Sequence, residues 1–434
     1  MSKQPQPKYS NHYKKAATPQ PVNTAKHVAE KITPPPKPLD VSKPVTLVFN
    51  ATDTLFFRES RPMEALGEAQ SVFPPPVRTL AGAVRTLIGE HFEVKWHDFN
   101  QKQGEHPLAD HIGYGESLGK LRFQGAWLAY NSARLYPAPL HLMKKDEQIF
   151  QLELAKTTEA VRCDWGENVR LPKLPSDDAR GSKPLENTWL TQAGLAAVLT
   201  GKIPSLEKTS KEKPNVKTQV YFAKDLFEQE SRLGIARDNA TRTVQKSLLY
   251  QTQHIRPKAE LSIELDVEGL PKDFLKSTAM IRLGGEGRTA SLSVQQTDSA
   301  LPTANISSTK FSLYLLTPLY GSPCLDFHRK KCEPTIWQGE LNGIALTLHG
   351  AITGKVQRVG GWDMAAGKPR PVKSLVPAGS VFFCSVEDGG DVKAAVKAVI
   401  KALHNQRIGA FTEYGYGHLA VGVWNDNETQ GNKA

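Results

Sequence analysis

The sequence predicts an α+β protein in which strands outnumber helices and a disordered arm precedes the folded chain. Strand-like segments follow one another without regular alternation with helices, which argues against a doubly wound sheet. Helical spacing of apolar residues is clear in only three segments. The first 44 residues hold eight lysines and nine prolines against two acidic residues, a composition typical of disordered chain. This arm is either a polyanion-binding segment or a solvated tail without a partner.

The composition favours a soluble protein with a negatively charged partner. The chain has 434 residues, enough for two or three domains, and its formal net charge is +11. Four irregularly spaced cysteines do not form a disulfide framework. No apolar segment resembles a signal peptide, and none reaches the ~20 residues that span a bilayer. We therefore expect a cytoplasmic location and no membrane partner.

The first half is predicted to contain a strand, two helices and a basic hairpin. A strand is expected over 45–57, and a helix introduced by prolines over 73–92. A second helix over 188–201 ends at a glycine, and a lysine-rich loop follows over 202–217. Residues 231–256 alternate like a strand that enters a basic hairpin.

Two glycines and two arginines share one face of the first predicted helix. A stripe at this spacing predicts that another backbone approaches the helix closely, and tight packing of the helix on a sheet is the alternative to an RNA chain. The stripe consists of Arg78, Gly82, Arg85 and Gly89.

The second half is predicted to be mostly strands, with one helix over 391–404 and a glycine-rich loop before the last strand. Together these elements suggest a ferredoxin-like βαββαβ domain, and the first half is compatible with another copy. The expected organisation is a disordered arm over 1–44, ferredoxin-like domains over 45–255 and 256–425, and a tail over 426–434.

Two glycine loops resemble the G-x-G-x-x-A fingerprint of dinucleotide-binding proteins, at Gly285 and at Gly415. That chemistry requires a helix after the loop, whereas both loops continue into strand-like sequence. No phosphate-binding P-loop is present, so no nucleotide cofactor is expected. The second loop offers glycine N–H groups for phosphates, and Phe411, Tyr414 and Tyr416 for stacked bases. Structural glycines at a sheet edge are the alternative.

Two further groups of residues are weak candidates for chemistry. Cys324, His328 and Cys332 have even spacing but lack the close cysteine pair usual for zinc, so an ordinary basic loop is favoured. His418, directly after the second glycine loop, could act as an acid or base in RNA cleavage. A hydrogen bond from His418 to a phosphate is the preferred alternative, because no catalytic partner is evident in the sequence.

Several segments together resemble one family, the third RAMP subunit of the Cmr (type III-B) CRISPR complex. Their order along the chain makes the resemblance specific, although each is weak alone, and they run from about Val45 to Trp424. The segments are DTLFFRESRPME, FPPPVRTLAGAVR, RLGIARDNATRT with LLY, IRLGGEGR, GGWDMAAGKPRP and VPAGSVFF. The arm, the 202–217 loop and the Cys324 segment have no counterpart in this pattern.

The resemblance implies tandem ferredoxin-like RAMP domains that bind the 5′ repeat-derived handle of crRNA and have no catalytic role. It also implies contact with the large polymerase-like subunit and with the first backbone subunit. A RAMP-type endoribonuclease that processes the crRNA precursor is the alternative function. The residues expected to bind RNA are Arg58, Arg61, Phe73, Arg78, Arg85, Arg242, Gly284, Gly285, Arg288, Gly361, Trp362, Lys368, Arg370, Gly415, Tyr416, Gly417 and His418.

Overall fold

The computed structural model describes residues 43–60, 68–209, 217–238, 240–272, 274, 278–296, 300–330, 336–364 and 366–426. All of them belong to one compact unit, Pro38–Ala434. The predicted arm and the predicted C-terminal tail lie almost wholly outside the described residues, so both remain predictions. None of the described helices is long and apolar enough to cross a membrane.

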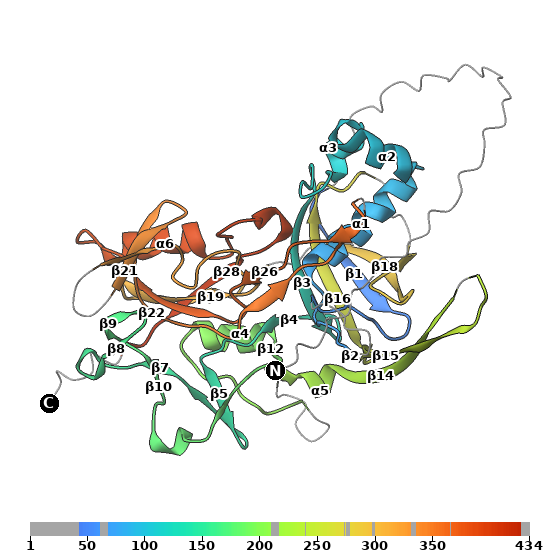
Figure 1. The fold of residues 1–434 in the computed structure, drawn as a ribbon. Coiled ribbons are helices and arrows are strands. Elements are labelled where there is room, and N and C mark those ends of the chain that lie inside the picture. The colour runs from blue at the N-terminus through green and yellow to red at the C-terminus, as the bar shows by residue number, and fades with distance from the viewer. Residues whose placement is uncertain are drawn as a thin grey trace, which may run out of the picture. The chain divides into compact units, whose positions relative to one another are not determined.

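The first of two large sheets has eight strands, and it joins segments far apart in the sequence (Figure 1). Four of its strands, numbered one to four along the chain, are β1, β3, β16 and β18. Across the sheet they lie in the order 4-1-3-2, and neighbouring strands are antiparallel. Across the whole sheet the order is β13 (Val220–Phe222), β12 (Thr188–Leu190), β4 (Ala133–Pro137), β3 (Arg122–Tyr130), β16 (Leu261–Glu268), β1 (Val45–Ala51), β18 (Thr289–Gln296) and β17 (Ala279–Arg282).

The second large sheet has six strands and repeats the same spatial pattern. In chain order β19, β22, β27 and β28 again lie as 4-1-3-2, with antiparallel neighbours. Across this sheet the order is β20 (His328–Lys330), β21 (Ile336–Leu341), β22 (Ile344–Ile352), β27 (Val381–Ser385), β19 (Lys310–Leu315) and β28 (Leu419–Val423).

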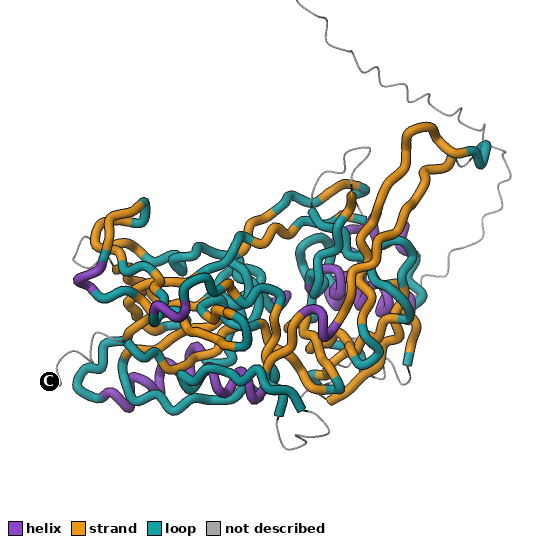
Figure 2. The backbone as a smooth tube through the Cα atoms, turned by 90° about the horizontal axis from the view of Figure 1, so that it is seen from below, coloured by secondary structure: helices purple, strands orange, loops and turns teal. Residues whose placement is uncertain are grey.

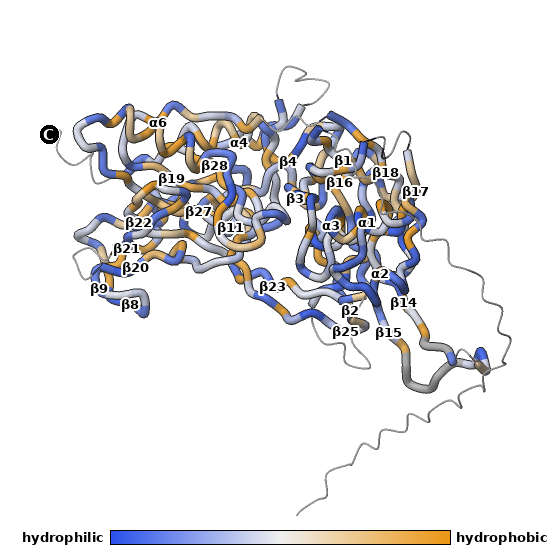
Figure 3. Tube along the Cα trace, turned by 90° about the horizontal axis from the view of Figure 1, so that it is seen from above, coloured by the Kyte–Doolittle hydropathy of each residue, from blue (hydrophilic) through white to orange (hydrophobic). Residues whose placement is uncertain are grey.

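Two longer helices begin at side-chain caps, and the first helix follows the prolines. α6 (Val392–Leu403) begins where the Asp391 carboxylate accepts from the N–H of Ala394, and its apolar side packs on β22 and β28. Figure 3 shows hydrophobic and hydrophilic positions alternating along it. The other helices are α1 (Val77–His91), α2 (Trp96–Lys102), α3 (Ala109–Ile112), α4 (Gln192–Leu199), capped by Thr191, and α5 (Ala223–Leu226). The helix expected over 188–201 is therefore shorter, because residues 188–190 form β12.

A long hairpin projects from the first sheet (Figure 2). Its strands are β14 (Phe227–Arg237) and β15 (Val244–Pro257), and the short β2 (Glu68–Ala69) pairs with β15. The predicted basic hairpin is thus present and longer than expected.

The remaining strands form small sheets in the connections. They are β11 (Lys183–Pro184) with β5 (Leu142–Lys145) and β6 (Gln148–Gln151), β7 (Glu153–Leu154) with β10 (Pro172–Lys173), β8 (Val161–Cys163) with β9 (Gly166–Val169), β23 (Gln357–Val359) with β26 (Lys373–Leu375), and β24 (Trp362–Asp363) with β25 (Lys368–Pro369). Single 3-10 turns occupy η1 (Gln103–Glu105), η2 (Thr157–Glu159), η3 (Asp177–Ala179) and η4 (Thr412–Tyr414).

The sheets correct the predicted division of the chain at 255/256. β16, β17 and β18 follow that point in the sequence, yet they pair with β1 and β3 in the first sheet. A cut there would separate β1 from both of its neighbours. The second sheet begins only at Lys310.

The two hydrophobic cores exchange elements. The core of the second sheet includes Leu195 and Leu199 of α4, from the first half of the chain. The core of the first sheet includes Tyr414 and Tyr416, which lie in the loop between α6 and β28, here called the α6–β28 loop (residues 404–418). Each half therefore completes the core of the other.

The α6–β28 loop touches the first sheet through a glycine. Gly415 has φ +87°, and a β-carbon added to it would lie 2.7 Å from the Cα of Gln124 and from the carbonyl oxygen of Phe123, both on β3. A β-carbon on Gly417, with φ +72°, would collide with the carbonyl of Ile408. Glycine is therefore required at position 415 for the loop to lie against β3, and at position 417 for the loop to pack on itself.

We therefore expect Gly415→Val to destabilise the fold, because backbone atoms of β3 cannot move aside as a side chain could. The cost should be about 3 kcal/mol or more, seen as a lower midpoint of thermal unfolding. Gly389→Val is the matched control, since Gly389 also has positive φ (+54°) but nothing within 4 Å of an added β-carbon. Equal loss in the two variants would show that the contact with β3 contributes nothing.

Two buried histidines make stability depend on pH. Burial lowers the pKa of both His141 and His418 to about 3, from an ordinary value near 6.5. Each is therefore neutral in the folded protein and takes up a proton on unfolding below pH 6.5. Their contribution is complete above pH 6.5 and is lost as the pH falls from 6.5 towards 3.

The free energy of unfolding should fall by about 1 kcal/mol per pH unit for each histidine below pH 6. In His141→Phe, the slope of the free energy of unfolding against pH should be smaller by about 1 kcal/mol per pH unit. Denaturant unfolding at pH 7, 6 and 5 measures this slope. His97→Phe, at an exposed position of α2, is the control. An unchanged pH dependence in His141→Phe would contradict the assignment.

Candidate nucleic-acid interface

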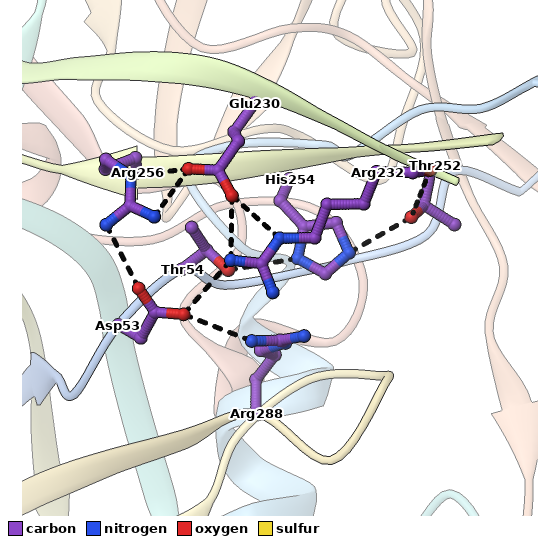
Figure 4. Close-up of polar contacts among 8 residues, drawn as sticks. All are labelled: Asp53, Thr54, Glu230, Arg232, Thr252, His254, Arg256 and Arg288. Carbon is purple, nitrogen blue, oxygen red and sulfur yellow. Dashed lines mark hydrogen bonds and ion pairs between the residues drawn. The ribbon is translucent and has the colours of Figure 1, made fainter. Parts of the chain in front are cut away.

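Three of the segments that carry the sequence resemblance meet at one cluster of charges, the Asp53 cluster (Figure 4). The cluster consists of Asp53, Glu230, Arg232, Arg256 and Arg288. Oδ2 of Asp53 lies 3.1 Å from Nη2 of Arg232 and 3.3 Å from Nη1 of Arg288. Its Oδ1 lies 3.0 Å from Nη1 of Arg256. Glu230 forms ion pairs of 2.7 and 2.5 Å with Arg232 and Arg256.

The cluster lies over a firmly held hairpin base. Leu55 and Ile255 exchange two backbone hydrogen bonds of 2.8 Å. His254 joins Thr54 and Thr252 through its two ring nitrogens, each at 3.1 Å (Figure 4). The ring of His254 also stacks on Phe56, with centroids 5.0 Å apart. The hairpin base is therefore fixed by backbone and buried side chains beneath the charges.

Both carboxylates of the Asp53 cluster favour the ionised form. A hydrogen bond from the backbone N–H of Thr54 lowers the pKa of Asp53, and Arg232 and Arg256 lower it further against the opposing effect of desolvation. Arg232 and Arg256 lower the pKa of Glu230. Three guanidiniums face two carboxylates, so the cluster carries one net positive charge.

A second cluster, the Glu116 cluster, joins α1 to a segment of the second half. Glu116 forms ion pairs with Arg78 at 2.6 Å and with Arg370, and Arg370 also contacts Asp363 at 3.2 Å. The guanidinium carbon of Arg78 lies 5.0 and 4.5 Å from the ring centroids of Phe411 and Tyr414.

These contacts make Arg78 a joining residue between α1 and the α6–β28 loop. Its side chain is only 14% exposed, so little of it is accessible to a ligand.

The segment that carries Arg370, here called the β23–β26 segment (residues 354–376), presents basic and apolar side chains to solvent. The N–H of Gly360 donates to Oγ of Ser60 at 2.8 Å, close in sequence to exposed Arg58. Trp362 is 58% exposed, and β24 pairs with β25, which carries exposed Lys368. Gly361, with φ +124°, has nothing within 4 Å of an added β-carbon. Gly361, Trp362 and Lys368 thus lie on one exposed segment, and Arg58 is an exposed residue two positions before Ser60, which contacts that segment.

The α6–β28 loop does not present its residues as expected from the sequence. Tyr416 is 3% exposed and His418 1%, so neither can stack on a base or reach a phosphate in this structure. The N–H groups of Gly415 and Gly417 donate to the carbonyls of Thr412 and Pro318. The prediction that this loop holds an RNA backbone is corrected to the structural alternative: Gly415 lies against the protein's own β3, and Gly417 lies against Ile408 of the same loop.

Other expected RNA-binding residues also serve the protein itself. Arg85 donates to the carbonyl of Gly113 at 2.7 Å, and burial lowers its pKa. Phe73 packs edge-on against Phe227 with centroids 4.8 Å apart. Added β-carbons on Gly284 and Gly285 would meet the carbonyl and the ring of Phe56.

The two glycines of the predicted stripe on α1 differ in their surroundings. Gly89 lies against the ring of Trp96, whereas nothing lies within 4 Å of a β-carbon added to Gly82. Tight packing within the protein therefore accounts for Gly89 alone.

Arg242 is not assigned a role by its position, and two other expected residues lie outside the described residues. Arg242 is exposed in the turn of the β14–β15 hairpin. Arg61 lies outside the described residues, and so does Cys332 of the weak zinc candidate. Of the other two zinc candidates, Cys324 is half-buried and His328 is exposed on β20. Among the described residues no group of three or more metal-binding side chains occurs.

A polar cleft of about 630 Å³ lies beside the Glu116 cluster, and sequence reasoning missed it. Two of its lining residues are Arg122 of β3 and Arg407 of the α6–β28 loop; Nη2 of Arg407 donates to Oε1 of Gln124 at 2.6 Å. Ser117, Asn405, Gln406 and Thr412 add polar groups. Arg407 lies within the glycine-rich stretch, but only the fold brings it opposite Arg122, 285 positions earlier in the chain.

The chain is similar to known proteins of one kind. A family model described as "CRISPR-associated protein (Cas_Cmr3)" matches residues 47–424. No curated protein matches the chain.

Chains of three solved structures are also similar to this chain. A chain of a type III-B Cmr-beta complex bound to cognate target RNA and AMPPnP is 15% identical, with a TM-score of 0.42 over 87% of this chain and 98% of that chain. A chain of Cmr-beta bound to cognate target RNA is 16% identical, with a TM-score of 0.43 over 86% and 96%. A chain of a type III-A Csm3-Csm4 subcomplex is 10% identical, with a TM-score of 0.35 over 80% and 96%.

The matched residues include both large sheets, the β14–β15 hairpin and the α6–β28 loop. Because the family model extends over nearly all of the described chain, the resemblance found in the sequence is confirmed, and the protein belongs to the Cmr3 family of CRISPR-associated proteins.

Proposed function

We propose that the protein is a non-catalytic RNA-binding subunit of a type III-B CRISPR (Cmr) effector complex. In this role it grips the 5′ handle of the crRNA and joins the large polymerase-like subunit to the first backbone subunit. Membership of the Cmr3 family supports the assignment to the complex. The RNA-binding role rests on the exposed β23–β26 segment.

The β23–β26 segment has the chemistry of a single-stranded nucleic-acid surface. Its exposed side chains include Trp362 and Met364 between the basic residues Lys355, Arg358, Lys368 and Lys373. An exposed indole offers a face to an unstacked base, and neighbouring lysines attract phosphates. Asp363, the acidic residue of the segment, is neutralised by Arg370. The polar cleft lined by Arg122 and Arg407, with Glu413 as its one acidic lining residue, adds a second polar surface with basic groups.

We also propose that each large sheet is the core of a ferredoxin-like RAMP domain. The spatial order 4-1-3-2 with antiparallel neighbours is that of a βαββαβ unit. In the first sheet α1 connects strands one and two, and in the second α6 connects strands three and four. The proposed domains interlock, because each contributes side chains to the other's core.

The burial of His418 supports the non-catalytic role over the endoribonuclease alternative. An acid or base must reach the atom to or from which it transfers a proton. His418 is buried, hydrogen-bonded to Asn405 at 2.7 Å, and burial lowers its pKa to about 3.

We expect Trp362→Ala to weaken binding of repeat-derived handle RNA at least fivefold, because a stacked base contributes ~1–3 kcal/mol. Fluorescence anisotropy with labelled RNA measures the affinity. Trp165→Ala is the matched control, a tryptophan of similar exposure in the β8–β9 turn that is expected to leave affinity unchanged. Equal affinities for wild type and Trp362→Ala would remove the β23–β26 segment from the interface.

The non-catalytic role is tested by incubating the full-length protein with repeat RNA in the presence of a metal chelator. We expect the RNA to remain intact after hours, as seen on a denaturing gel. Specific cleavage that follows the protein through purification would support the endoribonuclease alternative.

A further inference from the structure

We propose that Arg232, Arg256 and Arg288 form a binding site for phosphodiester groups of single-stranded RNA, with Asp53 and Glu230 holding the three guanidiniums in place. This inference rests on the proposed RNA-binding function and adds a surface separate from the β23–β26 segment. Of these residues, only Arg288 was expected from the sequence to contact RNA.

The hairpin base does not need these charges for its stability. Backbone hydrogen bonds between Leu55 and Ile255 already fix β15 to the segment after β1. The hydrogen bonds of the buried His254 side chain with Thr54 and Thr252 do the same. Ion pairs between exposed side chains contribute ~0–1 kcal/mol each. The five charged side chains therefore add little to the stability of the hairpin base, and we infer that they bind a ligand.

The geometry of the guanidiniums leaves N–H donors for an anion. A guanidinium has five N–H donors in one plane, so it can bind a carboxylate along one edge and a phosphate along another. Arg288 meets Asp53 through Nη1, and Arg232 uses Nε and Nη2 for Glu230 and Asp53 (Figure 4). Within the described part of the chain, Nη2 of Arg288 and Nη1 of Arg232 have no hydrogen-bond partner. Donors on both residues thus remain available for an anion.

The Asp53 cluster is accessible and has the charge that an anion requires. The side chains of Asp53 and Arg256 are both 46% exposed, and those of Arg232 and Arg288 are 31% and 21% exposed, so each arginine is at least partly open to solvent. The cluster's net charge of +1 favours an anionic ligand. The arginines come from three separate places, β14, β15 and the turn before β18, and Asp53 contacts all three. Asp53 is accordingly a positioning residue, expected to order the arginines without touching the RNA.

The test begins with Arg256→Gln/Arg288→Gln in the full-length chain. Affinities for handle RNA and for an unrelated RNA of equal length are measured from low to high salt. We expect the log–log salt slope to become shallower by about 1.4, or ~0.7 for each lost contact, equally for both RNAs. Arg162→Gln/Arg180→Gln removes the same charge at two exposed positions and should leave the slope unchanged. If the first double variant unfolds, Arg288→Gln alone should shift the slope by about 0.7.

Asp53→Asn tests the positioning role, because this role and the loss of a negative charge change RNA affinity in opposite directions. Removing a negative charge should strengthen RNA binding if charge alone matters. We expect binding to weaken at least threefold with the slope retained, because the arginines lose their common anchor. Glu286→Gln, an exposed position two residues before Arg288, removes the same charge without contacting the cluster and should not weaken binding.

A wild-type slope in both arginine variants, or tighter binding by Asp53→Asn, would overturn the phosphate site. Failure of the wild-type protein to bind either RNA would instead overturn the proposed function itself.

Discussion

The contact between the α6–β28 loop and β3 is the constraint on which the rest of the structure depends. Gly415 brings the loop against the backbone of the first sheet, and Tyr414 and Tyr416 then enter its core. Arg78 lies over Phe411 and Tyr414 and pairs with Glu116. Through Arg370, Glu116 also holds the β23–β26 segment. The exposed surface proposed for RNA is therefore positioned by a buried joint between the two sheets.

Residues that resemble an RNA-binding set divide into two kinds. Arginines and aromatics in the joint are buried or paired with one another, and they set the relative placement of the surfaces. Trp362, Lys368 and the arginines of the Asp53 cluster remain accessible. Motifs that lie far apart in the sequence thus contribute to one interface in two ways. Some residues are proposed to contact the RNA, here called contacts, and others hold the contacting elements in place, here called supports. A substitution in a support is expected to reduce stability first, whereas one in a contact is expected to reduce affinity.

Much of the fold was predictable because local patterns agree with it. The helices at α1 and α6 and the strands at β1, β16, β19, β27 and β28 follow from apolar spacing and capping residues. The boundary at 255/256 was wrong because strand pairing across more than 200 residues leaves no local signal. The role of the Gly415 loop was misjudged for a related reason: a glycine that admits an RNA backbone and one that admits a protein backbone are identical in sequence. The clusters around Asp53 and Glu116 required the fold itself, since their partners lie on separate elements.

The first sheet has a consequence for how the protein is made. β1 emerges from the ribosome early, but its neighbours β16 and β18 are synthesised only after residue 260. Until then both edges of β1 are unpaired, and its apolar side chains Leu47 and Phe49 lack their final partners. Long-range pairing of this kind is slow and leaves nascent chains prone to aggregation. Truncated versions ending before β18 are therefore unsuitable for expression, and chaperones that shield the nascent N-terminal strand should raise the yield of the full-length chain.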